Sequence, residues 1–293
     1  MVSGSMVPWF HGSIPSMTSD WARRYLNLLG LAPPQTPDLE WLHTFGAAHL
    51  RAVPFSNVTA ILRRLASDGE SVPAVDRESQ LSAWEGATGG GVCFEVADMV
   101  WALLTGLGFE AHIVLGQITF PGSHQAVVVR LREGPYMVDL GCGAPLPEPI
   151  PLIRDSEYHV AGLGYRFRPD LASMTCAQDR QIDGEWTEFC RYDLRPATDE
   201  DRHEGYQRHH VPGESWVIGS ITLMRYFQTE DEVVALRDGR FTRYRSGEKH
   251  SAPVEADEDY AHYVREDLRW PELPVLEALA GLRALAGSEP LGS

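Results

Sequence analysis

Apolar residues recur at helical spacing through the first third of the chain. Shorter series predict helices over residues 20–29, from about residue 38, and over 76–86, with Gly46 leaving the length of the second open. The clearest series is Val96, Met99, Val100, Leu103, Leu104 and Leu107, which follows the i, i+3, i+4, i+7 pattern of one buried helix face. We therefore expect an N-terminal helical region that ends with a helix beginning at Cys93.

Short β-rich runs replace this pattern after residue 109. Residues 112–115, 125–131 and 136–140 predict strands, and Glu133-Gly134-Pro135 predicts the turn between the last two. Further strands are expected around 165–167 and 186–194, and an extended loop over Pro145–Pro151, which holds four prolines. The middle third therefore predicts an antiparallel sheet or barrel.

The last third mixes both kinds of pattern. Residues 199–204 are polar throughout and predict a connector, while 217–223 and 233–236 predict strands. A hairpin turn is expected at Asp238-Gly239. Residues 257–268 and 273–284 predict closing helices, so this part should be mixed α and β.

Charge and cysteine usage narrow the function classes. The net charge of −16 argues against nucleic acid and anionic membranes as partners, since both require a basic surface. Residues 1–16 do not read as a secretory signal, and no apolar run is long enough to span a membrane. The four cysteines have no CxxC spacing, and His203, His209 and His210 match no metal motif. We expect a cytoplasmic protein with reduced thiols and no metal site.

Cys93 follows three glycines and begins the central predicted helix. Unpaired N–H groups and the positive end of the helix dipole favour an anion there, so a thiol at this place ionises more easily. Glu95 in the same turn is expected to support the helix start. The pattern predicts a nucleophilic cysteine, although a buried free cysteine is usually inert.

Two further residues give this cysteine a chemical context. His124 begins one predicted strand and Asp139 ends the next, and strands joined by a tight turn pair antiparallel. The two side chains should therefore be neighbours, with the carboxylate orienting an imidazole that deprotonates a thiol. A loop histidine and a turn-capping aspartate are the alternative interpretation of the same two residues.

The chain resembles the arylamine N-acetyltransferases from about residue 20 to 270. The motifs that carry the resemblance are Leu42-His43, Pro54–Asn57, Gly90–Glu95, Ser123-His124, Val138–Gly141, Pro149–Leu152, Val211–Ser215 and Asp238–Arg240. The resemblance implies an α+β fold with an N-terminal helical bundle, a central antiparallel β-barrel and a C-terminal α/β lid around a cysteine-protease-like core. We place the bundle at 17–108, the barrel at 109–210 and the lid at 211–290.

The resemblance also implies an activity. Cys93, His124 and Asp139 would form a Cys-His-Asp triad that moves an acyl group from a thioester to an amine, most simply an arylamine, by a ping-pong mechanism. The donor would be acetyl-CoA, another acyl-CoA or an acyl carrier protein thioester, with no permanently bound cofactor. The oxyanion would be held by backbone N–H groups, with those of Cys93 and the Gly122-Ser123 segment as candidates.

Three departures from the family pattern bear on the substrate. Gly89 stands where the family usually has Arg, Val96-Ala97 where it has Asn, and Cys142 where it has Phe. The expected substrate pocket comprises Phe55, Val92, Phe120, Gly122, Ser123, Cys142 and Gly143. Such pocket changes leave open an amide synthase of a natural-product pathway that uses a carrier-bound acyl chain. A papain-like hydrolase or transglutaminase and a non-catalytic binding protein are the remaining alternatives.

Overall fold

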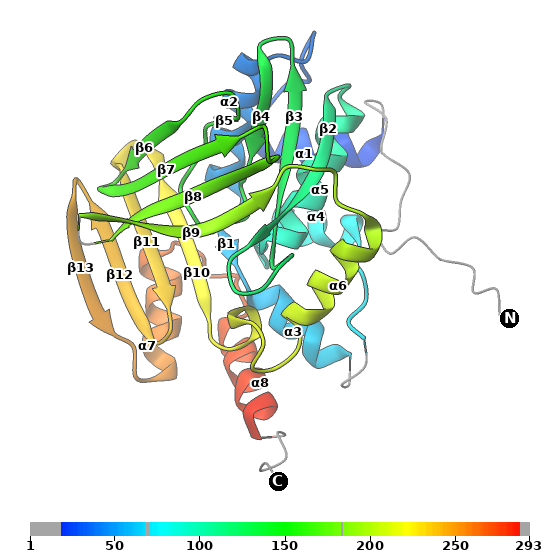
Figure 1. The fold of residues 1–293 in the computed structure, drawn as a ribbon. Coiled ribbons are helices and arrows are strands. Elements are labelled where there is room, and N and C mark those ends of the chain that lie inside the picture. The colour runs from blue at the N-terminus through cyan, green and yellow to red at the C-terminus, as the bar shows by residue number, and fades with distance from the viewer. Residues whose placement is uncertain (1–18, 68–70, 183, 288–293) are drawn as a thin grey trace, which may run out of the picture.

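Two antiparallel sheets and a group of helices make up the protein (Figure 1). The computed structural model describes residues 19–67, 71–182 and 184–287. The expectation for residues 1–16 lies outside these residues. None of the helices within the described ranges is both long and apolar enough to cross a membrane.

The N-terminal helices surround one central helix. They are α1 (Asp20–Leu29), α2 (Leu39–Ala52), α3 (Val58–Ala66), α4 (Arg77–Glu85) and α5 (Cys93–Gly106). Ser19 caps α1 through its side chain, and Gly30 ends α1 in the left-handed conformation, as the sequence predicted. Helix α2 continues through Gly46. The missing side chain permits close packing, since a Cβ there would lie 1.9 Å from the carbonyl oxygen of Pro147.

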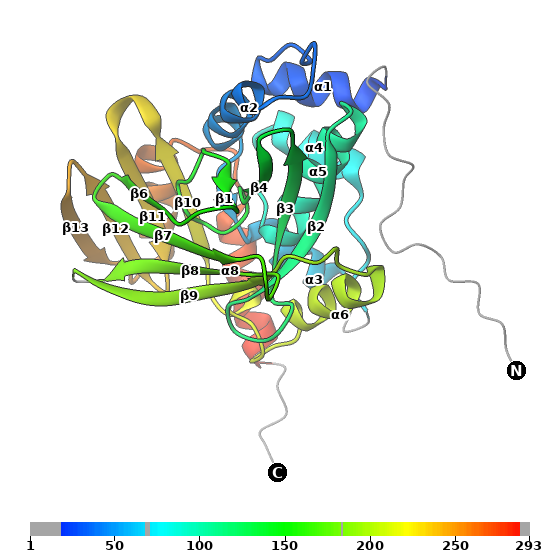
Figure 2. The ribbon, with the colours of Figure 1, turned by 45° about the horizontal axis from the view of Figure 1, so that its top comes forward.

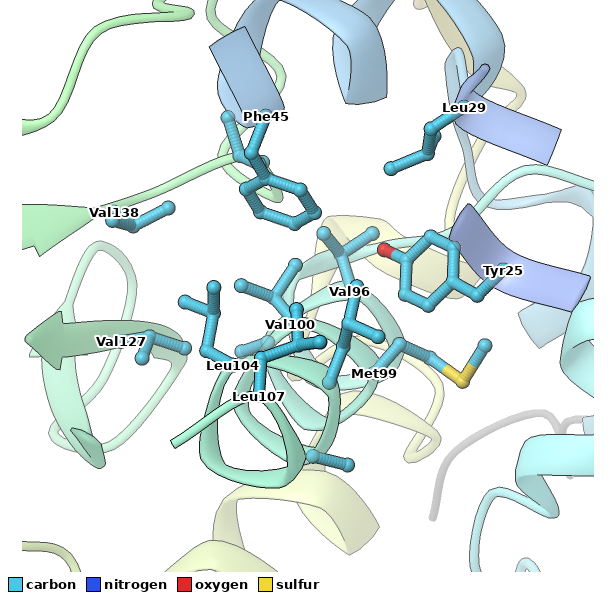
Figure 3. Close-up of a cluster of buried hydrophobic side chains, with 14 of the residues drawn as sticks. Tyr25, Leu29, Phe45, Val96, Met99, Val100, Leu104, Leu107, Val127 and Val138 are labelled. Atoms are coloured by element: carbon cyan, nitrogen blue, oxygen red, sulfur yellow. The ribbon is translucent and has the colours of Figure 1, made fainter. Parts of the chain in front are cut away.

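Helix α5 is buried on nearly every side rather than on one face. Its apolar residues pack between α1 and α2 on one side and the sheet on the other, where Val127 and Val138 meet them (Figure 3). Each such side chain contributes roughly 1.5–3 kcal/mol by leaving water. This packing fixes the helix that begins at Cys93 against the strands that carry His124 and Asp139.

The larger sheet has eight strands and curls into a nearly closed barrel (Figure 1). Its strands are β2 (Glu110–Gln117), β3 (His124–Leu131), β4 (Gly134–Val138), β5 (Ile150–Pro151), β6 (Ser156–Val160), β7 (Leu163–Asp170), β8 (Thr175–Ile182) and β9 (Glu185–Asp193). They lie in the order β5-β4-β3-β2-β9-β8-β7-β6, and all neighbours are antiparallel. The predicted strand pair β3 and β4 is therefore confirmed, but Gly134 already pairs with Leu131, which places the turn at residues 132–133 rather than 133–135.

The smaller sheet lies across from β6–β9, with helices behind it (Figure 2). Its order is β1 (Phe55–Ser56), β10 (Thr222–Phe227), β11 (Glu232–Arg237), β12 (Arg240–Arg245) and β13 (Glu248–Pro253). The chain closes with α7 (Asp257–His262), a π-helical segment (Tyr263–Asp267) and α8 (Val275–Gly287), which packs on α3. Asp238 and Gly239 both have positive φ, so the predicted hairpin turn is confirmed.

Three expectations from the sequence were wrong or incomplete. Residues 199–204 are no connector but begin helix α6 (Asp199–His209), which Thr198 caps. Residues 217–223 are mostly a 3-10 turn (Trp216–Ile218) and a bend, and strand β10 begins only at Thr222. Helix α3 and strands β6, β8, β12 and β13 were not predicted either. The strands carry many polar or exposed residues, which weaken the hydrophobic period. Helix α3 has a clear apolar face but only nine residues, so its pattern is short.

Candidate active site

Cys93 is the first residue of α5, and a network of charges holds this helix start. Val92 occupies the N-cap, and its N–H donates to Glu95 Oε2 at 2.7 Å. The other oxygen of Glu95 binds Arg63 of α3. Glu95 therefore supports the start of the helix, as the sequence predicted. The Cys93 side chain beside it is buried, with 4% of its surface exposed.

Arg63 places a positive charge near the start of α5, although the arginine expected at position 89 is absent. The expected arginine before the cysteine is absent, and a side chain at Gly89 would place its Cβ 2.6 Å from Thr59 Cγ2 of α3. Helix α3 instead contributes Arg63, which reaches Glu95 and the Tyr206 hydroxyl. A cation thus stands near the start of α5 even without an arginine at position 89.

His124 and Asp139 meet beside this helix start. Strands β3 and β4 pair with Val127 opposite Val138, which brings the first residue of β3 close to the residue after β4. His124 Nε2 lies 2.9 Å from Asp139 Oδ2, and both side chains are buried. Cys93 lies close enough to His124 to raise the pKa of its imidazole. The structure therefore brings the three predicted residues together in the order Cys93–His124–Asp139.

The electrostatics of the pair favour a charged imidazole. Burial lowers the pKa of His124, but the Asp139 carboxylate and Cys93 together raise it by more, to about 10. Burial raises the pKa of the Asp139 carboxyl, whereas His124 and the Tyr192 hydroxyl lower it to below its ordinary value. Imidazolium and carboxylate are thus the stable forms near neutral pH.

The other three thiols have a different environment. Burial raises the pKa of Cys142 and Cys190 well above the ordinary thiol value, and that of Cys176 to about 12. Within the described ranges, no histidine acts on these three thiols as His124 acts beside Cys93. They are held as neutral thiols.

We expect His124 to keep its proton across the neutral range. Because the pKa of His124 is raised, its charged form persists from about pH 6.5, where a free imidazole loses its proton, up to about pH 10. The ¹⁵N chemical shifts of the His124 ring, followed by NMR, should stay those of an imidazolium between about pH 6.5 and 9. A ring that loses its proton near pH 6.5 would contradict stabilisation of the charged form by Asp139.

Tyr192 of β9 extends the network beyond the three predicted residues. Its hydroxyl donates to Asp139 Oδ2 at 2.7 Å and lies 2.9 Å from the side-chain amide of Gln178 on β8. Both residues are fully buried. Tyr192 was not predicted from the sequence, because Asp139 is distant along the chain and no local spacing links the two residues.

Tyr192→Phe is expected to slow acylation of the enzyme about 5- to 30-fold while leaving the fold intact. The change removes one hydrogen bond to a carboxylate, which is worth roughly 1–2 kcal/mol at a buried charge. Stopped-flow measurement of CoA release in the first turnover gives the rate. Tyr25→Phe in α1 is a matched control, since the Tyr25 ring is also fully buried but its hydroxyl lies 2.8 Å from His49 Nδ1, in the core of the helical region. Equal losses in both variants would deny Tyr192 a role in orienting Asp139.

A cavity of about 330 Å³ lies between strands of the two sheets. Cys93, His124 and Asp139 do not line it, but Cys142, whose thiol contacts the Asp139 carbonyl, does. Of the predicted pocket residues, Phe55, Cys142 and Gly143 line it. Val92, Phe120, Gly122 and Ser123 do not, because they pack under α6 or around the start of α5. Ile118 and Thr119 line the cavity and were missed, although they directly precede the predicted Phe120.

Ser123 organises the loop in front of His124. Its hydroxyl accepts N–H bonds from Ile118 and Thr119, and its carbonyl binds His209 of α6. The Ser123 N–H donates to the Phe120 carbonyl at 3.0 Å, so it is not available to bind an oxyanion as expected. The N–H of Cys93, at the first position of α5, has no acceptor within its helix.

Comparisons with known proteins show what the chain is similar to. The chain matches the N-acetyltransferase family model over residues 38–270. The arylamine N-acetyltransferase of Mycolicibacterium smegmatis is 28% identical over 237 residues, which cover 76% of this chain and 82% of the relative. The solved arylamine N-acetyltransferase from Salmonella typhimurium has a TM-score of 0.73 at 20% identity, covering 91% of this chain and 99% of that one.

A second solved structure carries a ligand. The Mycobacterium marinum arylamine N-acetyltransferase in complex with CoA has a TM-score of 0.73 at 18% identity and covers 90% of this chain and 97% of its own. At these identities the two structures establish a shared fold. The fold class expected from the sequence is confirmed.

Proposed function

The chain belongs to the arylamine N-acetyltransferase family, and from this premise we propose that it transfers an acetyl group from acetyl-CoA to an arylamine through a thioester on Cys93. One observation carries the mechanism. His124 lies 2.9 Å from Asp139 and interacts with the Cys93 thiol at a helix start. This is the arrangement of nucleophile, base and orienting carboxylate that acyl transfer requires.

The first half-reaction moves the acetyl group to the enzyme. In the resting enzyme His124 already carries the proton of the Cys93 thiol, and the Cys93 thiolate attacks the thioester carbonyl of the donor. The resulting oxyanion is stabilised by the free N–H of Cys93 and the positive end of the α5 dipole. The tetrahedral intermediate then expels the CoA sulfur, which takes a proton from His124. One thioester replaces another, so the acyl-enzyme forms at little thermodynamic cost.

The second half-reaction delivers the acetyl group to the amine. The amine nitrogen attacks the acyl-enzyme carbonyl and gives its proton to His124, and the Cys93 thiolate leaves. Asp139 stabilises the imidazolium in both half-reactions and does not itself take up the proton. The free enzyme returns with its ion pair intact.

The cavity favours small partners over a long acyl chain. Its volume of about 330 Å³ lies near the lower limit for small-molecule sites and fits one aromatic ring with substituents. The related M. marinum structure is a complex with CoA, which supports a CoA thioester as donor. An amide synthase acting on a carrier-bound polyketide would need a much wider channel beside Cys93.

We also propose that the protein is cytoplasmic and that each of its three regions contributes a different part of the site. All four cysteines are free, which is typical of a reducing compartment such as the cytoplasm. Residues 17–108 would supply the nucleophile, 109–210 the base and its carboxylate, and 211–290 the far wall of the substrate cavity.

Steady-state kinetics test the proposal. With acetyl-CoA varied at several fixed concentrations of 4-anisidine, a simple arylamine, double-reciprocal plots should give parallel lines, because CoA leaves before the amine enters. Intersecting lines would indicate a ternary complex and would contradict a thioester on Cys93. Consumption of acetyl-CoA at the same rate with and without amine would instead identify a hydrolase.

A further inference from the structure

His209 is a buried histidine that the acetyl-transfer mechanism does not use. It is the last residue of α6, and 2% of its surface is exposed. It belongs to no metal motif in the sequence, and no group of side chains that could hold a metal ion occurs among the described residues. Of the described residues that line the cavity between the sheets, none belongs to α6. The role of His209 therefore depends on what its ring contacts outside that cavity.

Both ring nitrogens of His209 are engaged in hydrogen bonds. Nε2 lies 2.5 Å from the Ser123 carbonyl oxygen, and Nδ1 lies 2.6 Å from the Ser215 hydroxyl. A carbonyl oxygen can only accept, so Nε2 carries the proton and Nδ1 accepts from Ser215. Burial lowers the pKa of His209 to about 3, which keeps the ring in this neutral form. With both nitrogens occupied, His209 is no second base toward Cys93, and its Nε2–H holds a backbone carbonyl instead.

The ring of His209 contacts residues next to both reacting side chains. Its centroid lies 5.0 Å from that of Phe94, the residue after the nucleophile, and 5.2 Å from that of Phe120, in the loop that precedes the base. The carbonyl that it binds belongs to Ser123, the residue directly before His124. His209 therefore lies between the start of the helix that carries the nucleophile and the end of the loop that leads to the base.

Helix α6 lies directly on the same loop one turn earlier. Gly205 is four residues before His209, so the two share a helix face. A Cβ on Gly205 would lie 2.4 Å from the Gly122 carbonyl oxygen and 3.1 Å from Phe94 Cζ. No side chain fits at this distance, so the glycine lets α6 approach until the His209 ring reaches Ser123.

Local bonds set the shape of the loop before His124 but not its position. The Ser123 hydroxyl and N–H bond to residues 118–120 of the same short loop. The bond from His209, by contrast, ties Ser123 to another element. The separation between Cys93 and His124 thus depends on a contact made by α6.

We propose that His209 is a positioning residue, which holds the loop before His124 against the start of α5 and so sets the distance between the base and Cys93. Its effect on rate rests on the proposed acetyl transfer, but the contact itself can be measured without turnover. A displacement of about 1 Å between reacting groups can cost about 10²-fold in rate. Loss of the His209 ring should therefore slow the chemistry at Cys93 more than it weakens the binding of the donor.

First-turnover kinetics with acetyl-CoA test the effect on rate. His209→Leu should lower the saturating rate of CoA release about 10- to 100-fold and change the acetyl-CoA concentration for half-saturation less than about threefold. His209→Gln, whose amide can donate to Ser123 and accept from Ser215, should retain most of the rate. His210→Leu removes the neighbouring buried histidine, which bonds to the Tyr206 carbonyl, and its rate should stay within about twofold of the wild type. Equal losses in His209→Leu and His210→Leu, or a loss confined to half-saturation, would overturn the proposal.

The ¹⁵N chemical shifts of the histidine rings test the contact without turnover. In the wild type, His209 should show the neutral Nε2–H tautomer near pH 7, and an imidazolium ring there would overturn the proposal. In His209→Leu the loosened loop weakens the pairing of His124 with Asp139, so the pKa of His124 should fall and its ring should lose the proton at a lower pH than in the wild type. The same titration of His124 in both proteins would contradict a positioning role.

A second variant covers the case in which His209→Leu does not fold. Ser215→Ala removes the hydroxyl that donates to Nδ1 of His209, and it should slow first-turnover CoA release about threefold or more. An unchanged rate in Ser215→Ala would overturn the proposal. If the wild type itself releases no CoA, the proposed acetyl transfer fails, while the ring shifts still decide whether His209 positions His124.

Discussion

Replacing Cys93 with alanine is expected to lower the rate of amine acetylation by at least about 10⁴-fold, to near the uncatalysed rate. Removing a nucleophile eliminates the covalent route, and the remaining triad residues have no thiol to activate. The side chain is buried at the start of α5, and the Arg63–Glu95 network that holds the helix start does not involve its sulfur. The fold should therefore survive. The measurement is the release of CoA with acetyl-CoA and 4-anisidine at saturation.

A second buried thiol provides the control for this variant. Cys176→Ala removes a fully buried cysteine from β8 that has no contact with His124. Its turnover should stay within about twofold of the wild type, with unfolding temperatures recorded for both variants. Substantial turnover by Cys93→Ala, at a rate within about tenfold of the wild type, would show that the acetyl group reaches the amine without a cysteine thioester.

Asp139→Asn is expected to lower the rate of enzyme acylation by about 10³- to 10⁴-fold. The carboxylate raises the pKa of His124, and its loss returns the buried imidazole to the neutral form that burial favours. With the pKa of His124 lowered, the ring should be neutral near pH 7 and gain a proton only as the pH falls further. First-turnover CoA release and the ¹⁵N chemical shifts of the His124 ring report the two effects.

Asp179→Asn is the control for this variant, because it removes a buried carboxylate that is not part of the triad. Asp179 on β8 is also buried, and it forms ion pairs with Arg166 and Arg168 on the face of the sheet away from the cavity. This variant should lower the unfolding temperature and keep an acylation rate within a few-fold of the wild type. If Asp139→Asn were no slower than Asp179→Asn, the carboxylate at position 139 would have no part in catalysis.

The sequence predicted the central geometry because each part of it is local. Three glycines followed by a helical series place Cys93 at a helix start, and one tight turn places His124 near Asp139. Such contacts depend on short-range spacing, which a hydrophobic pattern records. The resemblance to the family then gave the three residues a common role.

Other parts of the site depend on long-range contacts that leave no local signal. Tyr192 lies 53 positions from Asp139, and Arg63 lies 32 positions from Glu95. Helix α6 was missed because it is polar on most of its surface, and it buries Arg202, Tyr206 and His209 at helical spacing. These residues are charged or aromatic and are buried through ion pairs and hydrogen bonds. Their segment therefore has the polar composition expected of an exposed connector.

Two departures from the family pattern can be placed in the structure. Gly89 stands where an arginine was expected, and Arg63 of the neighbouring helix α3 lies at the start of α5 in an ion pair with Glu95. Cys142 stands where a phenylalanine was expected, and it lines the cavity. The position of Arg63 could not be predicted from Gly89, since it requires knowing which helix packs against the start of α5.

The most direct test of the account is the intact mass of the protein after incubation with acetyl-CoA in the absence of amine. A single acetyl adduct is expected on the wild type, mapped to Cys93 by peptide analysis, removed on addition of 4-anisidine and absent from Cys93→Ala. An adduct on another residue, an adduct that persists in Cys93→Ala, or no adduct while acetylated amine still accumulates would contradict Cys93 as the acyl carrier.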